Sequence, residues 1–238
     1  WNPEEIDVSP DKSSWEDMTD AYKHIYLSNL KYQVLLDTIQ GRGPLATLGS
    51  VASLTELESC LSVWQFMEGI HSRSYTHLIK TIFPNPSEIF DQILTDEAIV
   101  CRAKSITGQY NSFLDLGNRS KTDLYLLLIS INILEGIRFY VSFACSFAFG
   151  TNGLMLKSAK IMQKIAQDEN LHLQISQFLL KTLPKDDNDF AIIAKANEDV
   201  VLEMYSIACN EEIAWAEHLF KFGPILGLNS ELIEQYVK

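Results

Sequence analysis

Residues 67–75 read MEGIHSRSY, and three polar residues in this stretch, Glu68, His71 and Tyr75, lie at positions i, i+3 and i+7 among apolar neighbours. At about 100° per residue, these positions share one stripe of an α-helix. If the stripe faces the interior, three polar groups are buried together, which is costly unless something binds or pairs with them. The stretch therefore predicts a helix with a polar site in a protein core.

A second Glu-x-x-His pair, Glu169 and His172 in QDENLH, has the same spacing as Glu68 and His71. In each pair, the carboxylate and the imidazole can reach one point from adjacent helical turns. A single pair is weak evidence, because Glu and His fall three residues apart by chance in many helical proteins. Two pairs on separate long helices favour a shared metal site.

Two further carboxylates, Asp37 in VLLDTIQ and Glu135 in NILEGIRF, complete the pattern. Helical bundles with a dinuclear metal site take one carboxylate from each of two helices and Glu-x-x-His from each of the other two. Asp37 alone would more often be a solvated or capping group, but Glu135 lies in an apolar segment. Four buried carboxylates balance two divalent cations, and without metal they would take up protons or loosen the bundle. The sequence therefore predicts an all-α, ferritin-like helical bundle with a dinuclear metal site in its core.

Tyr75 lies one turn beyond the first predicted histidine ligand, which places its phenol near the metals. Phe139 and Phe143 share the predicted face of the apolar helix, and Ile165 lies one turn before the second Glu-x-x-His pair. Together they could shield the phenol from water, as a persistent oxidised radical would require. The competing interpretation is a core tyrosine whose hydroxyl is hydrogen-bonded. The carboxylate-rich ligand set suits iron or manganese better than zinc or copper.

Helical periodicity dominates the chain, and no alternating strand pattern of useful length occurs. Glycine and proline in QGRGP end the first long helix, SLTE at 53–56 resembles a capping box for the second, and Pro184 ends the helix with the second Glu-x-x-His pair. LGNRSKTD at 116–123 is expected to form a loop. With no repeat or linker, residues 1–238 are predicted to form a single domain. The expected helices cover residues 17–40, 53–82, 87–94, 96–116, 123–149, 154–183, 189–222 and 230–237.

The composition restricts the function. The chain has 238 residues, 47% of them hydrophobic, and its net charge of −12 argues against a surface for nucleic acid or anionic lipid, because both need a positive field. The four cysteines are scattered without a CxxC pair, and we expect reduced thiols in a cytoplasmic protein. We expect the remaining histidines, His24, His77 and His218, to be structural or exposed and to lie outside the site. The acidic cluster of Glu211, Glu212 and Glu217 is expected to be a solvated face.

Residues 124–150, LYLLLISINILEGIRFYVSFACSFAFG, are long enough to cross a bilayer and contain only Glu135 and Arg138 as charges. No second span or positive flank accompanies them, which favours the core helix of a bundle over a membrane helix. The chain starts at Trp1 without Met or a basic-then-apolar leader, so we read no signal peptide and expect a fragment of a longer protein.

Four stretches identify a family: KYQVLLDTIQGR, EGIHSRSYTH, LEGIRFYVSFACSFAF and IAQDENLH. They match, in order, motifs of the small, radical-generating subunit of class I ribonucleotide reductase, and the sequence resembles this family over nearly the whole chain. It is most similar to the tyrosyl-radical, di-iron branch. The resemblance implies that Tyr75 is the radical site and that an apolar pocket of Phe139, Phe143 and Ile165 surrounds it. It also implies the metal ligands, which are Asp37, Glu68, His71, Glu135, Glu169 and His172.

The same resemblance implies two further roles. Trp1 in the opening WNPEE would relay an electron, and Asp168 would link it to the metal-bound His71. A carboxylate in this place holds the imidazole through its outer nitrogen.

The implied activity is that of a ribonucleoside-diphosphate reductase. The reduced metal pair would bind and split dioxygen and oxidise Tyr75, and the radical would pass reversibly to a separate large subunit that reduces ribonucleotides to deoxyribonucleotides. Iron is favoured, with manganese or a manganese/iron pair as alternatives. The implied assembly is a homodimer that binds the large catalytic subunit, with no nucleic-acid or membrane partner.

Some parts depart from the family. The loop around Asn118 to Lys121 is shorter than in many relatives, and Gln167 stands where an arginine is common. The C-terminal docking tail with its relay tyrosine is not in this chain, so Tyr236 should not be mistaken for that residue.

Two other interpretations stay open. A ferritin-like di-metal oxidase or iron-handling protein would use the same ligands, but Tyr75, Trp1 and Asp168 argue against it because those chemistries do not need this relay. A metal-free helical interaction module would be expected to lose at least one of the six ligands, and all six are present.

Overall fold

The computed structural model describes residues 1–115 and 119–238. Within these ranges the regular structure is helical, and the β-type pairing is an isolated bridge between Ile225 and Leu228. The prediction of an all-α fold is therefore confirmed. Residues 116–118 lie outside the described ranges. They include the start of the loop predicted at 116–123 and Asn118, where the shortened loop begins.

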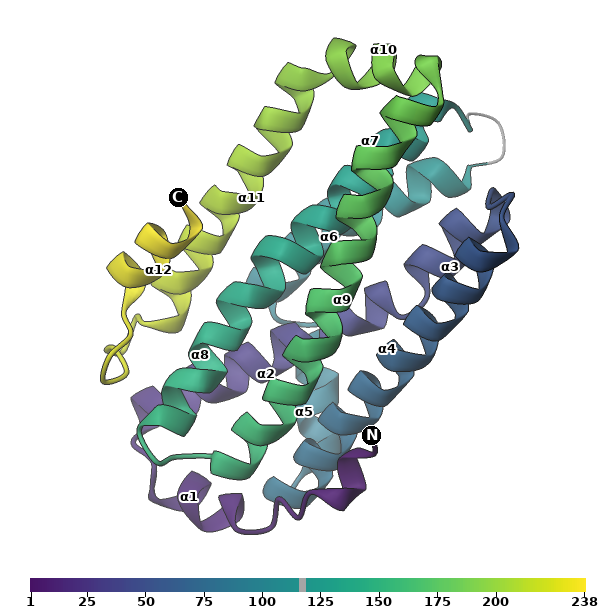
Figure 1. Ribbon diagram of the computed structural model, residues 1–238. Coiled ribbons are helices and arrows are strands. Elements are labelled where there is room, and N and C mark those ends of the chain that lie inside the picture. Colours follow the sequence, from purple (N-terminus) through teal and green to yellow (C-terminus); the bar gives the residue numbers. More distant parts are fainter. Residues whose placement is uncertain (116–118) are drawn as a thin grey trace.

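Four long helical segments surround the core (Figure 1). Three of them are α2 (Asp20–Gln40), α4 (Thr55–Ile82) and α9 (Leu156–Asp186). The fourth is continuous and consists of α7 (Lys121–Ile133), the π-helical turn η3 (Leu134–Arg138) and α8 (Phe139–Thr151). α2 packs against α4, α4 against α9, α9 against α7 and α8, and α8 against α2, so the four segments close a ring. A side chain that points inward from any of them therefore reaches the same interior.

Other helices cover this ring. α6 (Glu97–Leu114) and α11 (Glu198–Leu219) pack against α2 and α7. The N-terminal elements contact α4 and α9 at one end of the bundle (Figure 1). The shorter elements are η1 (Pro3–Glu5), α1 (Asp11–Asp17), α3 (Gly43–Thr47), η2 (Leu48–Ser50), α5 (Pro86–Ile93), α10 (Asn188–Ala196) and α12 (Ser230–Val237).

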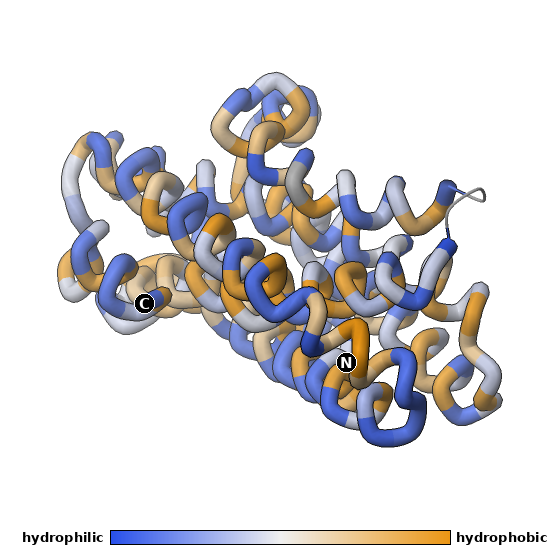
Figure 2. The backbone as a smooth tube through the Cα atoms, turned by 90° about the horizontal axis from the view of Figure 1, so that it is seen from above, coloured by the Kyte–Doolittle hydropathy of each residue, from blue (hydrophilic) through white to orange (hydrophobic). Residues whose placement is uncertain are grey.

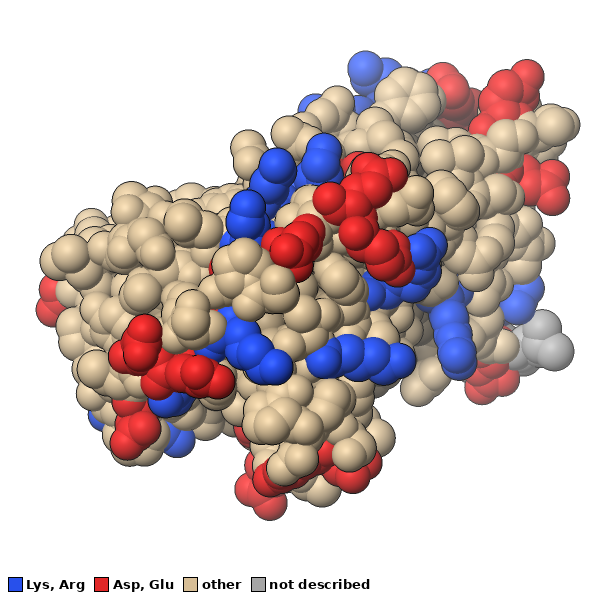
Figure 3. All heavy atoms as spheres, turned by 90° about the horizontal axis from the view of Figure 1, so that it is seen from below, with Lys and Arg blue, Asp and Glu red and all other residues tan. Residues whose placement is uncertain are grey.

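The main core consists of large side chains from every segment of the ring. Trp64, Tyr75, Phe139 and Phe143 are buried in it, and Trp215 of α11 joins them. Each such side chain contributes about 1.5–3 kcal/mol when it leaves water. Hydrophobic and hydrophilic residues alternate along the outer helices (Figure 2), as expected for helices with one buried face. On the surface seen from below, Lys and Arg are interspersed with Asp and Glu (Figure 3).

The most apolar segment is a core helix. The run Lys121–Thr151 is long and apolar enough to cross a membrane, but most of its apolar stretch is buried inside the protein. It contacts α2, α6, α9 and α11 on different sides. This burial fits the interpretation of residues 124–150 as the centre of a bundle.

Two helix starts differ from the sequence prediction. The capping box predicted at Ser53 and Glu56 is wrong, because α4 begins after Leu54, which has extended backbone and makes no side-chain cap. A capping box instead opens α7, where Ser120 and Asp123 exchange hydrogen bonds between side chain and backbone.

Three helix ends also differ. Pro184 does not stop α9, which continues to Asp186, because a proline near the end removes one backbone donor without preventing the last residues from staying helical. The helix expected over 189–222 is divided at Asn197 into α10 and α11, and asparagine favours such ends by bonding to nearby backbone. The first long helix starts at Asp20, capped by Thr19, after the separate helix α1.

Candidate metal centre

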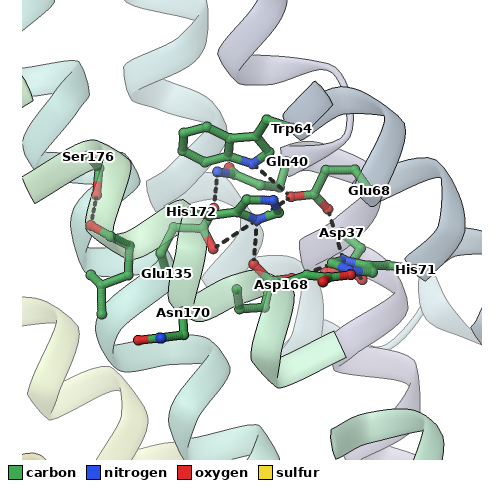
Figure 4. Close-up of polar contacts among 12 residues, drawn as sticks. Asp37, Gln40, Trp64, Glu68, His71, Glu135, Asp168, Asn170, His172 and Ser176 are labelled. Atoms are coloured by element: carbon green, nitrogen blue, oxygen red, sulfur yellow. Dashed lines mark hydrogen bonds and ion pairs between the residues drawn. The ribbon is translucent and has the colours of Figure 1, made fainter. Parts of the chain in front are cut away.

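The structure brings all six predicted ligands together in the core. Figure 4 shows five of them, Asp37, Glu68, His71, Glu135 and His172. Each segment of the ring supplies at least one of them, and no side chain in the set is more than 2% exposed. Burial therefore removes water as a partner for these polar groups. The set is Asp37 from α2, Glu68 and His71 from α4, Glu135 from η3, and Glu169 and His172 from α9.

The six residues form two overlapping groups. In each group, one ligand atom per residue lies within 4.8 Å of the others. The first group is Asp37, Glu68, His71 and Glu169, and the second is Glu68, Glu135, Glu169 and His172. Because Glu68 and Glu169 belong to both, these two carboxylates can bridge two cations, and the remaining residues can complete one site each.

Both imidazoles present Nδ1 to the carboxylates. Nδ1 of His71 lies 3.1 Å from Oε1 of Glu169 and 3.5 Å from Oε2 of Glu68. Nδ1 of His172 lies 2.9 Å from Oε2 of Glu169 and 3.2 Å from Oε1 of Glu68. A neutral imidazole can bind a cation through this nitrogen. The histidines thus face the space between the two shared carboxylates.

The hydrogen bonding of the cluster is incomplete within the protein. Five buried carboxylate oxygens accept no hydrogen bond: both of Asp37, Oε2 of Glu68, Oε2 of Glu135 and Oε1 of Glu169. Each buried acceptor without a donor costs about 1–3 kcal/mol, and more when charged. Two divalent cations would supply the missing partners and offset four carboxylate charges. The donor set fits a metal pair, and its excess of oxygen suits iron or manganese.

The protonation of the cluster also depends on its charges. Burial and neighbouring carboxylates raise the pKa values of Asp37 and Glu135 well above the usual range. Burial opposes ionisation of Glu169, but the two histidines outweigh it and lower its pKa. Burial disfavours the charged form of His172, but Glu169 and Glu68 outweigh it and raise its pKa to about 9. Without metal, the cluster holds protons that incoming cations must displace.

Two neutral donors each hold one oxygen of a cluster carboxylate. Nε1 of Trp64 donates to Oε1 of Glu68 at 3.0 Å, and the Trp64 ring stacks on His172 with 4.6 Å between centroids. The side-chain amide of Gln40 donates to Oε1 of Glu135. In both acids, the other oxygen stays free towards the cluster (Figure 4). Sequence analysis missed both donors, although Trp64 precedes Glu68 by one turn and Gln40 lies close to the end of α2.

Tyr75 lies beside the cluster. Its side chain is 1% exposed, and its hydroxyl faces Asp37 without reaching hydrogen-bonding geometry. Burial and the charge of Asp37 raise the pKa of the phenol well above its usual range, so it keeps its proton. Phe139, Phe143 and Ile165 are buried in the same core, and the two phenylalanine rings stack at 5.9 Å. These three side chains thus share the dry core with the phenol, and their role as a pocket around it stays a prediction.

A hydrogen-bonded chain leads from the N-terminal segment to the cluster. Nε1 of Trp1 donates to Oδ2 of Asp168 at 2.9 Å, and the same oxygen lies 3.2 Å from Nε2 of His71. Although burial raises it, the pKa of Asp168 is lowered by its hydrogen bonds with His71 and Trp1. Since Nδ1 of His71 faces the carboxylates, Asp168 fixes the orientation of the ring through its outer nitrogen.

One residue of the predicted solvated cluster on α11 lies in the core. Glu212 is 0% exposed, which makes the sequence prediction wrong for this residue, while Glu217 is exposed as expected. Oε1 of Glu212 lies 3.2 Å from Nη1 of Arg138 and also pairs with Arg102. The same oxygen accepts a hydrogen bond of 2.9 Å from the hydroxyl of Tyr32. Arg102 on α6 and Arg138 on η3 offset the charge of Glu212. The acid therefore connects α11 to η3, the turn that carries the predicted ligand Glu135.

The other histidines lie outside the cluster, in agreement with the sequence prediction. Nε2 of His24 contacts the backbone oxygen of His218 at 3.0 Å, and Nε2 of His77 contacts that of Ile6 at the same distance. These contacts join α2 to α11 and α4 to the N-terminal segment, which is a structural role.

A ring of helices whose core holds four carboxylates and two Glu-x-x-His histidines defines a ferritin-like di-metal carboxylate protein. A sequence model of one family, described as the small chain of ribonucleotide reductase, matches residues 1–238. The chain belongs to this ribonucleotide reductase family, whose members are components of an oxidoreductase.

Individual relatives agree with this assignment. The chain is 43% identical over 262 aligned positions to the ribonucleoside-diphosphate reductase subunit beta of Haemophilus influenzae, covering all of this chain and 70% of that protein. It is 42% identical to the ribonucleoside-diphosphate reductase 1 subunit beta of Escherichia coli O157:H7, with the same coverage.

Solved structures extend the comparison. A ribonucleotide reductase R2 subunit from Clostridium botulinum superposes with a TM-score of 0.92 at 28% identity, over all of this chain and 74% of that one. An R2-like ligand-binding oxidase with a Mn/Fe cofactor superposes with a TM-score of 0.79 at 15% identity, over all of this chain and 84% of that one. At that identity, the oxidase shows a shared fold only.

Proposed function

We propose that this chain, as a small subunit of ribonucleoside-diphosphate reductase, generates a radical on Tyr75 beside two metal ions and stores it there. The observation that carries the proposal is the pair of overlapping ligand groups, joined by Glu68 and Glu169, next to a buried phenol. Glu68 and Glu169, which belong to both groups, would help to hold both metals. The proposed ligands are Asp37, Glu68, His71, Glu135, Glu169 and His172.

The metal pair supplies dioxygen activation and the oxidising equivalent for the phenol. The protein controls what happens at Tyr75. Its hydroxyl proton leaves towards the free oxygens of Asp37, which the ring faces. Phe139, Phe143 and Ile165 then keep water and small reductants away from the oxidised ring. Iron is the favoured metal, with manganese or a manganese/iron pair as alternatives, and dioxygen is the oxidant.

Trp1 and Asp168 provide a path for the extra electron. The hydrogen bond between them and the contact of Asp168 with His71 connect an indole to the ligand shell without a gap. The side chain of Asp168 is 17% exposed, so this path reaches the protein surface at the N-terminal segment. An electron that enters at Trp1 would thus reach His71, one of the residues that would hold the metal pair.

The assembly follows from the same proposal. The radical would pass to a large catalytic subunit that reduces ribonucleotides, and the small subunit would act as a homodimer in the cytoplasm. The net charge of −12 disfavours nucleic acid or a membrane as partners. We also propose that residues 1–238 form a single domain, because one buried cluster joins all segments of the ring.

The direct test is radical formation. Anaerobic loading with ferrous iron followed by oxygen should give the electron paramagnetic resonance signal of a tyrosyl radical, and Tyr75→Phe should abolish the signal while two metal ions stay bound. Tyr125→Phe is the matched control, because Tyr125 packs in a separate small cluster. Absence of a radical with iron, and with manganese plus an activating flavoprotein, would sink the proposal. A radical that survives Tyr75→Phe would move the storage site to another residue.

A further inference from the structure

A second buried tyrosine is connected to the ligand cluster through one amide. The hydroxyl of Tyr110 on α6 donates to Oε1 of Gln40 at 2.7 Å, and Nε2 of Gln40 donates to Oε1 of Glu135. Tyr110 is 5% exposed, Gln40 1% and Glu135 0%. The three residues come from α6, α2 and η3, so the contact exists only because these elements pack together.

The amide of Gln40 can be placed in two orientations that differ by exchange of its oxygen and nitrogen. Glu135 must be ionised to bind a cation, and an ionised carboxylate accepts hydrogen bonds and cannot donate them, so in that state Glu135 requires the nitrogen. The hydroxyl of Tyr110 then donates to the amide oxygen on the opposite side. Burial raises the pKa of the Tyr110 phenol well above its usual range, and the charges of Glu135 and Glu68 add to this, so the proton stays on the hydroxyl.

Trp64 and Gln40 differ in one respect that makes Tyr110 necessary. Both donate to one oxygen of a carboxylate in the cluster. An indole carries a donor only, so Trp64 cannot turn an acceptor towards Glu68. Gln40 can rotate by half a turn and bring its oxygen against Glu135, where two acceptors would repel each other without water to separate them. The Tyr110 hydroxyl opposes this rotation because it would lose its own acceptor.

The backbone is shaped to admit the Tyr110 ring. A Cβ atom added to Gly43, the first residue of α3, would lie 2.4 Å from both Cε1 and Cζ of Tyr110 and 2.8 Å from its hydroxyl oxygen. No side chain fits in that space unless the ring moves. Gly43 follows Gln40 by three residues, so the turn after α2 places the amide and leaves room for its partner.

From these contacts we infer that Tyr110 is a positioning residue for the metal site of Glu135 and His172. Its hydroxyl fixes the orientation of the Gln40 amide, which holds the outer oxygen of Glu135 and leaves Oε2, 4.0 Å from Nδ1 of His172, to bind a cation. This role rests on the two-metal site proposed above. It concerns one site of the pair, because Asp37 and His71 lie in the other ligand group.

Manganese(II) binding under anaerobic conditions tests the inference without turnover. Free and bound Mn²⁺ differ in their electron paramagnetic resonance signal, so a titration gives stoichiometry and affinity. The wild-type chain should bind two ions, and Tyr110→Phe should weaken one site about tenfold to a hundredfold, as for loss of a hydrogen bond behind a ligand, with the other unchanged. Gly43→Ala should weaken the same site, whereas the control Tyr125→Phe should leave both sites unaltered.

A double-mutant cycle separates orientation of the amide from simple packing. If Tyr110 acts through Gln40, Tyr110→Phe should have no further effect on Mn²⁺ affinity in a Gln40→Leu background. An equal loss in both backgrounds, an equal weakening of both sites, or unchanged binding in Tyr110→Phe would overturn the inference. If the wild-type chain binds no Mn²⁺ or Fe²⁺, the two-metal site itself fails, which is a distinct result. Helical circular dichroism of each metal-free variant confirms that it is folded.

Discussion

The indole nitrogen of Trp1 donates a hydrogen bond of 2.9 Å to Oδ2 of Asp168, across 167 positions of the sequence. The same oxygen lies 3.2 Å from Nε2 of His71. One half-buried carboxylate therefore serves an indole on one side and an imidazole of the buried cluster on the other. Removing the carboxylate charge and removing the indole should have different effects.

Asp168→Asn should lower metal affinity about tenfold, because a neutral amide no longer favours the proton on Nε2 that leaves Nδ1 of His71 free for a cation. The measurement is a Mn²⁺ titration under anaerobic conditions. Asp186→Asn, an exposed position at the end of the same helix, is the matched control. Equal affinities for the two variants would show that Asp168 does not support His71.

Trp1→Phe should leave both metal ions bound and lower the yield of the Tyr75 radical. The phenyl ring keeps most of the packing but has no N–H to donate to Asp168, so electron delivery to the cluster is interrupted. Radical per bound metal, measured by electron paramagnetic resonance after oxygen exposure, tests this. An unchanged yield would exclude Trp1 from the electron path, and lost metal would assign it a structural role.

Glu212→Ala should destabilise the protein by about 3–5 kcal/mol, because it leaves Arg102 and Arg138 buried without their shared carboxylate. The free energy of unfolding in urea, at equal metal loading, is the measurement. Glu217→Ala, on the exposed side of α11, should change it by less than about 0.5 kcal/mol. Similar small losses for both variants would mean that Glu212 is solvated, as the sequence alone suggested.

The metal-free protein should lose stability as the pH rises from about 6.5 to about 9. The pKa of His172 rises from 6.5 to about 9 on folding, so its contribution is complete below pH 6.5 and disappears as the pH passes 9. The raised pKa values of Asp37 and Glu135 act in the same direction, because buried carboxylates that lose their protons destabilise the fold.

Urea unfolding of metal-free protein across this pH range checks the trend, and His172→Gln should reduce the slope. With bound Mn²⁺ the trend should reverse, since cations compete with the same protons and bind better at higher pH. A metal-free stability that rises between pH 6.5 and 9 would contradict the described electrostatics of the cluster.

Helical spacing selected the two Glu-x-x-His pairs that meet in the core, and the known ligand inventory of di-metal bundles added Asp37 and Glu135. Glu68 with His71, and Glu169 with His172, lie three apart, and this period holds for any straight helix whatever its neighbours. The structure places them together with Asp37 from another helix. What spacing could not give is the pairing between helices.

Contacts between helices explain the features that the sequence did not predict. Tyr110 meets Gln40, and Arg102 meets Glu212, only because α6 packs against α2 and α11. A run of acids on a helix is usually a solvated face, and the two buried arginines that reverse this for Glu212 lie 74 and 110 positions away. Helix ends such as Asn197 depend on local backbone bonds that compete closely with continuation of the helix.

The π-helical turn η3 changes which side chains of one long helix face the core. The N–H of Phe139 bonds to the oxygen of Leu134, five residues back, so the turn holds one residue more than an α-helical turn. That residue rotates everything downstream by about 100° relative to an uninterrupted helix. Deleting Gly136 should therefore rotate Phe139 and Phe143 relative to Glu135, although no side chain named in the site would be changed.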